Sequence, residues 1–186
     1  MCGEIGDRAD AERFGAPARH HQRIGVFKTE FAEQLGIRTI ADLAPRAASL
    51  SIAGDYEFFS RPEWTALRKA YGLSFRGQRQ MQPDFMYAAA ASGEVDVIAG
   101  YTSDGLIAKY DLVALEDVRQ AIPPYDAIML LAPKRADNAA LRAALVPLLG
   151  RIDIANMREA NLRAAGGDGA ASPDAVAHWL WEKIGK

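Results

Sequence analysis

The stretch that decides the fold is residues 93–125, GEVDVIAGYTSDGLIAKYDLVALEDVRQAIPPY. Its apolar run at 95–101 is typical of a buried strand. The turn residues Ser103, Asp104 and Gly105 then predict the cap of a short helix, and a second apolar run at 112–115 predicts another strand. Strand, helix and strand therefore follow one another, an order that indicates α/β layers.

Two tyrosines stand at the ends of core elements in this stretch. Tyr101 ends the first strand, and Tyr125 follows Pro123 and Pro124. Rings at such positions can form two walls of one pocket. Aromatic faces attract a cation that cannot donate hydrogen bonds, so such a pocket suits a quaternary ammonium group. The same residues also fit structural roles, Tyr101 as a half-buried core aromatic and Tyr125 as a brace for a hinge.

The rest of the chain extends the alternation in both directions. Further strands are predicted at 23–27, 50–54, 75–81 and 127–132. Helix starts are predicted at capping or first-turn residues, namely Thr29, Thr39 with Asp42, Pro62, Pro83 and Ser172 with Pro173. We expect a polar tail at 1–22, an α/β lobe with a mixed sheet flanked by helices at 23–132, and a segment of three helices at 133–186.

Composition and charge exclude several classes of function. The 186 residues carry 22 basic and 24 acidic side chains, a net charge of −2, which gives no electrostatic footprint for nucleic acid. Cys2 is the one cysteine, so no disulfide can form within the chain. His20 and His21 adjoin in the tail and His178 stands alone, a spacing that does not suit a metal site. Because phosphate-loop and nucleophile motifs are also absent, we expect no cofactor, no metal and no catalysis.

The sequence leaves the location of the protein open. No apolar run approaches the roughly 20 residues that a membrane-spanning helix needs. Residues 1–22 are polar and lack the apolar core of a signal peptide. Two locations therefore stay open. Either the protein is cytoplasmic, or it is exported by a signal that the sequence does not include.

Most of the chain, from Gly36 to Lys183 together with a segment just before Gly36, carries short segments in the order and spacing of a known family. They are FAE at 31–33 with IADL at 40–43, EFFSR at 57–61, KAYGL at 69–73, GEVDVI at 93–98, YTSDG at 101–105, YDL at 110–112, LED at 115–117 and PPY at 123–125. Together they resemble the glycine betaine/carnitine/choline substrate-binding proteins of ABC transporters. Any one segment alone is unspecific.

The resemblance implies a two-lobed clamp with the periplasmic-binding-protein type II fold, which closes on its ligand without chemistry. By position, Tyr101 and Tyr125 become walls of an aromatic cage around a trimethylammonium head, and Arg61 faces the ligand carboxylate. A small quaternary amine and an ABC transporter permease are the implied partners, and the implied location is periplasmic or extracytoplasmic. From the residues alone, Arg61 could instead pair with Glu57 or Glu63 at a helix end, and Asp104 reads as a helix cap.

Two departures from the family leave a second hypothesis open. From the resemblance we expect most of the family's first lobe to be missing here, and the helices at 139–186 then to lack a packing surface, which favours a homodimer or a swapped assembly. A family tyrosine near the crossover falls at Arg23, which places a cation where a cationic ligand would sit. The second hypothesis is a regulatory or protein-interaction module that has lost ligand capture. A small α/β enzyme is disfavoured, since the catalytic motifs are absent.

Overall fold

Five strands form one mixed sheet in the computed structural model, which describes residues 22–123, 129–165 and 169–185. The strands are β1 (Gln22–Lys28), β2 (Ser51–Gly54), β3 (Gly77–Gln80), β4 (Val97–Tyr101) and β5 (Leu112–Ala114), in the order β3-β2-β4-β1-β5. β2 runs parallel to β3 and β4, whereas β1 runs antiparallel to β4 and β5. The expected α/β class with a mixed sheet is confirmed.

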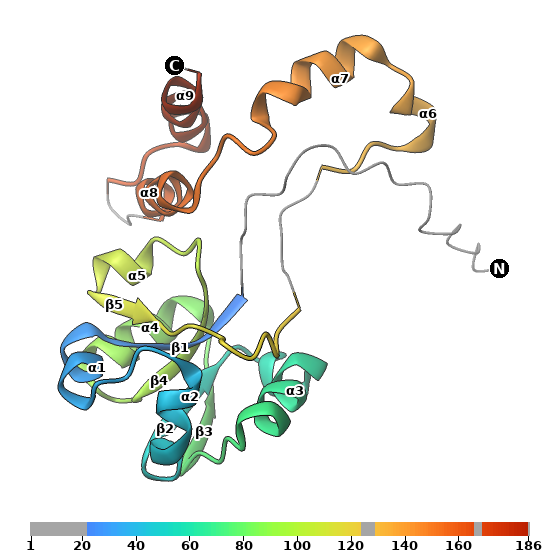
Figure 1. Cartoon of the computed structure of the whole chain (residues 1–186). Coiled ribbons are helices and arrows are strands. Elements are labelled where there is room, and N and C mark those ends of the chain that lie inside the picture. Colours follow the sequence, from blue (N-terminus) through green and yellow to red (C-terminus); the bar gives the residue numbers. More distant parts are fainter. Residues whose placement is uncertain (1–21, 124–128, 166–168, 186) are drawn as a thin grey trace.

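Helices pack around this sheet and continue beyond it (Figure 1). Those of the lobe are α1 (Thr29–Leu35), α2 (Ile40–Leu43), α3 (Pro62–Tyr71), α4 (Pro83–Ser92) and α5 (Leu106–Lys109), with the 3₁₀ turns η2 (Ala44–Ser49) and η3 (Phe58–Ser60). After the lobe come α6 (Pro133–Ala136), α7 (Ala139–Leu145), the 3₁₀ turn η4 (Val146–Leu148), α8 (Ile154–Ala164) and α9 (Pro173–Ile184). The described part of this segment thus holds four α-helices and not three, because Asn138 accepts a hydrogen bond from the Leu141 amide and starts α7 afresh.

Most of the predicted helix starts are correct. Thr39 and Asp42 form a reciprocal capping box, and Ser172 caps α9 by accepting a hydrogen bond from the Ala175 amide. The prediction for Thr29 is wrong: Lys28 occupies the N-cap position of α1. The Thr29 hydroxyl instead donates to the Asp111 carbonyl at 2.9 Å, because β1 runs straight into α1 beside the turn before β5.

The strand predicted at 127–132 is wrong over the part that the structure describes. Residues 129–132 belong to no strand, and residues 127 and 128 lie outside the described residues. A strand needs a neighbour for its backbone hydrogen bonds. The five-stranded sheet lies elsewhere, and the apolar side chains of Met129 and Leu131 face α7 instead.

Two apolar clusters hold the lobe together, one on each face of the sheet. Side chains of β4 alternate between them, since Val97 and Ala99 belong to the first cluster and Ile98 to the second. The first cluster also takes residues from α1, α2 and α3, including Ala32, Ile40, Leu43, Trp64 and Leu67. The second takes residues from α4 and α5, including Met86, Tyr87, Ala90, Leu106 and Ile107.

The sheet topology defines where a site is expected. The parallel strands β2, β3 and β4 end at Gly54, Gln80 and Tyr101, so their carboxyl ends meet at one edge of the sheet. Ligands of open α/β sheets bind in the crevice outside the carboxyl ends of the strands. The loops that leave this edge are therefore the first place to look for function.

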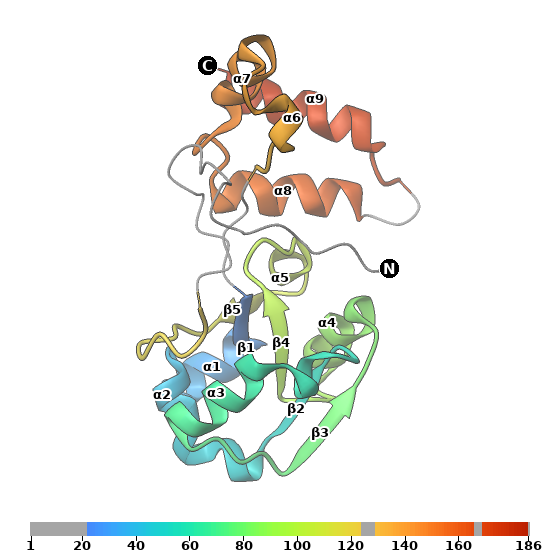
Figure 2. The same ribbon diagram turned by 90° about the vertical axis from the view of Figure 1, so that its right-hand side faces the viewer.

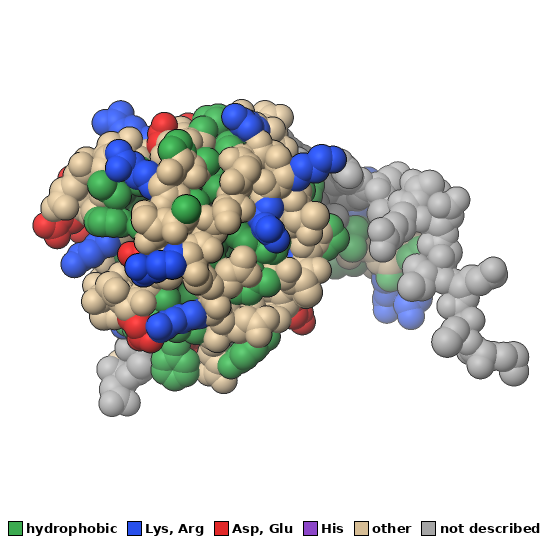
Figure 3. All heavy atoms as spheres, turned by 90° about the horizontal axis from the view of Figure 1, so that it is seen from below, with side chains coloured by type: hydrophobic (Ala, Val, Ile, Leu, Met, Phe, Trp, Pro, Cys, Tyr) green, Lys and Arg blue, Asp and Glu red, His purple; other side chains and the backbone are tan. Residues whose placement is uncertain are grey.

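The helices that follow the lobe lie on one side of it. In Figures 1 and 2, α8 lies between α5 of the lobe and α9. Helices α6 and α7 and the turn η4 contain no buried residue among those described. On the face of the lobe away from these helices, basic side chains are scattered singly among apolar and polar ones (Figure 3).

Candidate functional site

Tyr101 and Arg61 lie together at the carboxyl-end edge of the sheet. Tyr101 is the last residue of β4, and Arg61 is the N-cap residue of α3, which follows the loop after β2. Both side chains are half-buried. The Glu57 carboxylate raises the pKa of Arg61 above its ordinary value, and a hydrogen bond with the Tyr101 side chain raises it further. Two of the three residues that the sequence singled out are therefore neighbours.

Glu57 is the other partner of Arg61. Its carboxylate Oε2 lies 2.7 Å from Nη2 of Arg61, in an i, i+4 ion pair. The alternative prediction, that Arg61 pairs with Glu57 at a helix end, is thus confirmed. Because the Glu57 side chain is 76% exposed, the pair is a weak surface contact that a competing ligand group can displace.

Tyr87 and Asp104 contact the end of β4 and the turn that follows Tyr101. Tyr87 is buried in α4, and burial raises the pKa of its hydroxyl, as does the Asp104 carboxylate to which it is hydrogen-bonded. The Asp104 amide donates to the Tyr101 carbonyl at 3.0 Å, and Oδ1 of Asp104 accepts from the Leu106 amide at 3.4 Å. Gly105, and not Asp104, occupies the N-cap position of α5, so the cap prediction is off by one residue; Asp104 still holds the turn that follows Tyr101.

A cleft of about 440 Å³ opens between this turn and the carboxyl end of α8. Its lining residues are Tyr101, Ser103, Asp104, Asn161, Ala164 and Ala165. The last carbonyl groups of a helix carry partial negative charge. The cleft therefore combines an aromatic side chain, a carboxylate and a helix carboxyl terminus, three features that each favour a cation.

Helix α8 is tied directly to the turn after Tyr101. Arg158 donates from Nε to the Thr102 carbonyl, and Asn161 donates from Nδ2 to the Ser103 carbonyl at 2.8 Å. Gly105 packs so closely on α8 that an added Cβ would lie 2.5 Å from the backbone nitrogen of Leu162. The sequence analysis did not predict this contact, because no local sequence pattern indicates a contact between residues more than fifty positions apart.

A second cleft, of about 670 Å³, lies at the same edge of the sheet. It is lined by Tyr56, Gln80, Met81, Gln82, Phe85, Ala88, Ala89, Ser92 and Glu94. Tyr56 and Phe85 are 62% and 64% exposed. Tyr56 is therefore an exposed residue of this cleft, whereas Tyr71 and Tyr87 are buried.

Of the remaining site predictions from the sequence, one falls on an undescribed residue and one on a residue of β1. Tyr125 lies outside the described residues. Arg23 pairs with Gly100 in the β1–β4 ladder, so its backbone runs beside the strand that ends at Tyr101.

Among the described residues, no group of three or more His, Cys, Asp or Glu side chains could hold a metal ion. No described helix has the length and apolar character of a membrane span.

The architecture is that of the periplasmic-binding-protein type II class, in which an α/β lobe meets a binding cleft at the ends of its parallel strands. The chain belongs to the family of substrate-binding domains of ABC-type glycine betaine transport systems, whose model matches residues 14–182. This is a family of substrate-binding proteins, so the expectation of a protein that is not an enzyme is confirmed.

Relatives and solved structures agree with this assignment. The carnitine transport binding protein OpuCC of Listeria monocytogenes is 28% identical over 144 residues, which cover 76% of this chain and 47% of that protein. The glycine-betaine-binding protein of Pseudomonas aeruginosa is 32% identical over 148 residues, covering 72% of this chain and 47% of that protein. A glycine betaine/carnitine/choline ABC transporter structure matches with a TM-score of 0.82 at 28% identity, over 95% of this chain and 65% of its own. The chain spans about half the length of the curated relatives it matches.

Proposed function

We propose that this chain binds a small quaternary amine, such as glycine betaine, choline or carnitine, for delivery to an ABC transporter permease. The observation that carries the proposal is the cleft in which Tyr101, Asp104 and the carboxyl end of α8 converge. A quaternary nitrogen spreads its charge over methyl groups, so an aromatic face binds it at low desolvation cost. Each ring contributes about 0.5–2 kcal/mol.

Arg61 is proposed as the group that meets a ligand carboxylate. Its guanidinium has five N–H donors, and the contact with Glu57 engages Nη2. Donors therefore remain for a carboxylate after the Glu57 and Tyr101 contacts are made. A ligand carboxylate would compete with Glu57 for Arg61. Because the Glu57–Arg61 ion pair is exposed, displacing Glu57 costs little free energy.

Tyr125 is proposed as a second wall of the cage, on the strength of the family resemblance. It stands two residues beyond Pro123 in the sequence. By the same resemblance, Arg23 stands where the family has a tyrosine, and a cation at that position would oppose a cationic ligand. A periplasmic or extracytoplasmic location and the division into 23–132 and 133–186 belong to the same proposal.

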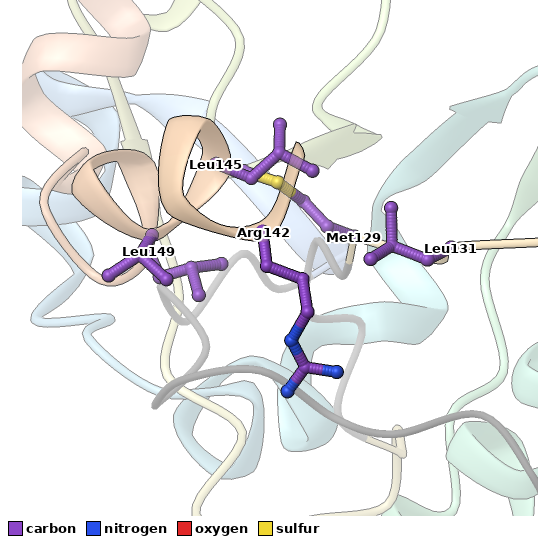
Figure 4. A pocket seen from close by; sticks show the side chains of 6 residues that line it. Met129, Leu131, Arg142, Leu145 and Leu149 are labelled. Carbon is purple, nitrogen blue, oxygen red and sulfur yellow. The ribbon is translucent and has the colours of Figure 1, made fainter. Parts of the chain in front are cut away.

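A second copy of the chain is the proposed partner of the helices after the lobe. A small apolar pocket on α7 and η4 is lined by Met129, Leu131, Leu145, Val146 and Leu149, with Arg142 at its rim (Figure 4). Leu130 and Val146 are 68% and 53% exposed. The related structure is longer, and about a third of it has no counterpart here. An apolar face of this kind favours association.

Calorimetric titration with choline, glycine betaine and carnitine tests the binding function. We expect heat and saturation with at least one of them, and a raised melting temperature in its presence. Ammonium and tetramethylammonium serve as controls, because only the second offers methyl groups to an aromatic face. If no quaternary amine gives heat or shifts the melting temperature, the proposal is wrong.

A further inference from the structure

The cleft between Tyr101 and α8 has a lining whose charge is of one sign. Among the described residues that line it, Asp104 carries the only charged side chain, and none is Lys or Arg. Ala164 is the last residue of α8 and Ala165 is its C-cap. The carbonyl groups at this end of the helix carry partial negative charge. The lining therefore favours a cation and disfavours an anion.

The Asp104 carboxylate is fixed at this lining by donors from two neighbouring elements. The Tyr87 hydroxyl of α4 is hydrogen-bonded to it, and its Oδ1 accepts from the Leu106 amide of α5 at 3.4 Å. Tyr87 is 1% exposed, and burial raises the pKa of its hydroxyl, so the hydroxyl keeps its proton at physiological pH. The same hydroxyl is hydrogen-bonded to the backbone of Tyr101. The carboxylate therefore has a defined position relative to the residue that ends β4.

Acceptor oxygens of Asp104 and Asn161 remain for a ligand. An ionised carboxylate offers about four lone-pair sites on its two oxygens, and the described donors to Asp104 are Tyr87 and Leu106. Asn161 donates from Nδ2 to the Ser103 carbonyl, which leaves its side-chain oxygen as an acceptor. A hydroxyl group on a bound cation can therefore donate to a residue of the lining.

Two arginines contact residues around this cleft, and each of them already has partners. Arg61 is paired with Glu57 at 2.7 Å and hydrogen-bonded to Tyr101, and Arg158 donates from Nε to the Thr102 carbonyl. Neither arginine is among the described residues that line the cleft. A ligand carboxylate would have to draw Arg61 away from Glu57, whereas a ligand without a carboxylate would not.

We propose that Asp104 is a specificity-determining residue, through which the cleft selects quaternary amines that carry a hydroxyl group and no carboxylate, such as choline, over zwitterions such as glycine betaine. The inference rests on the proposed quaternary-amine function and narrows the substrate class of that site. In glycine betaine a single methylene separates the nitrogen from the carboxylate carbon. A trimethylammonium group bound against Tyr101 therefore brings the ligand carboxylate close to Asp104, and like charges placed side by side lower the affinity for the wrong ligand.

The test is the ratio of the dissociation constants of glycine betaine and choline, both measured by calorimetric titration on the same protein. A loss of binding-competent protein weakens the apparent affinity for both ligands by the same factor, so the ratio reports selectivity and not stability. Tetramethylammonium, which carries neither a hydroxyl nor a carboxylate, is the reference ligand. In the wild type we expect choline to bind about tenfold more tightly than glycine betaine, with tetramethylammonium between them.

Two variants of the lining should reduce this preference. Asp104→Asn removes the charge and keeps the shape of the side chain, so the ratio should fall about tenfold, to near one. Ser103→Lys places a cation at the same lining and leaves both donors to Asp104 in place, so it should also lower the ratio. This second variant decides the matter if Asp104→Asn fails to fold.

Asp96→Asn is the matched control. Asp96 is also a half-buried carboxylate that is held by a backbone amide and a hydroxyl, since it accepts from the amide and the hydroxyl of Ser51, both at 2.7 Å. It directly precedes β4, whereas Asp104 follows that strand, so the two carboxylates lie at opposite ends of it. The control removes one charge away from the cleft and should leave the ratio unchanged.

A wild-type ratio near one, or a preference for glycine betaine, would overturn the selectivity and leave the proposed function intact. An unchanged ratio in the folded variants of the lining would also overturn it. An equal shift in Asp96→Asn would do the same, since net charge would then be the cause. If the wild-type chain binds no quaternary amine, the proposed function fails and the selectivity fails with it.

Discussion

Asn161 in α8 donates a hydrogen bond of 2.8 Å to the backbone carbonyl of Ser103, two residues after Tyr101. This bond joins the helices after the lobe to the turn that follows the strand ending at Tyr101. Arg158 reaches the neighbouring carbonyl of Thr102 in the same way. Because both acceptors are backbone atoms of one turn, the position of α8 and the shape of the cleft are set together.

Replacing Gly105 with alanine should separate α8 from this turn. The new Cβ would lie 2.5 Å from the nitrogen and 2.6 Å from the Cα of Leu162, both backbone atoms that cannot move aside alone. We expect a loss of stability of about 1–3 kcal/mol, in the range of overpacked cores, and weaker amine binding. Denaturant unfolding and calorimetry measure the two effects. Gly77→Ala is the control, since a Cβ there meets nothing within 4 Å.

Tyr101 should be the residue on which amine binding depends most within the described lobe. Tyr101→Leu removes the aromatic face, so affinity for choline should fall by about 0.5–2 kcal/mol. Tyr101→Phe keeps the face but loses the contact with Arg61, so it should preserve choline binding and weaken binding of carboxylate-bearing amines. Calorimetry on both variants separates the roles of ring and hydroxyl. Equal affinities for choline in Tyr101→Leu and wild type would place the cation elsewhere.

The local parts of this structure could be read from the sequence, and the long-range parts could not. The continuous apolar run of β4 and the Thr39–Asp42 capping box depend on neighbours within a few positions, and both were predicted. The contact of Asn161 with Ser103 joins residues 58 positions apart, and no sequence pattern in either segment indicates it. The Tyr71–Asp117 hydrogen bond spans 46 positions and was missed for the same reason.

Two errors in the predictions from sequence, the strand at 127–132 and the helix start at Thr29, have a common cause. The run at 127–132 has the composition of a strand, but strand formation depends on a neighbouring strand that composition does not reveal. Thr29 is a residue type that favours the N-cap position, but its hydroxyl donates to the carbonyl of Asp111, 82 positions away, instead. In both cases tertiary surroundings decided the outcome. The resemblance to a family supplied Arg61 and Tyr101 as a pair, which periodicity alone does not.

Glu57→Gln should shift ligand preference toward carboxylate-bearing amines. It removes the carboxylate that occupies Arg61 at 2.7 Å, so a ligand carboxylate no longer competes with it. Exposed ion pairs of this type are worth about 0–1 kcal/mol, and we expect glycine betaine to gain up to about fivefold in affinity relative to choline. Glu159→Gln, which breaks the exposed i, i+4 pair with Arg163 at 2.8 Å, is the control. A similar gain in that control would indicate a general charge effect.

Asp42 should make the lobe sensitive to acid. Hydrogen bonds from the Thr39 side chain and from the Arg38 and Thr39 amides lower the pKa of the Asp42 carboxyl below 3.8. A depressed folded-state pKa gives stability that is complete above the unfolded value and is lost as pH falls through the folded value. Melting temperature should therefore drop less steeply below pH 4 in Asp42→Asn than in wild type. Parallel curves for the two proteins would show that Asp42 does not contribute.

Self-association should depend on the exposed apolar residues around α7. Leu130 and Val146 are 68% and 53% exposed, and the pocket beside them is lined by apolar side chains apart from Arg142. Burying such a surface against a second copy would remove it from water, so sedimentation should show a dimer whose fraction rises with concentration. The double variant Leu130→Lys with Val146→Lys should be monomeric, because a charged side chain cannot be buried there without a partner. Phe85→Lys, which alters an equally exposed residue of the lobe, should leave the dimer intact. A wild-type chain that stays monomeric at high concentration would contradict the pairing.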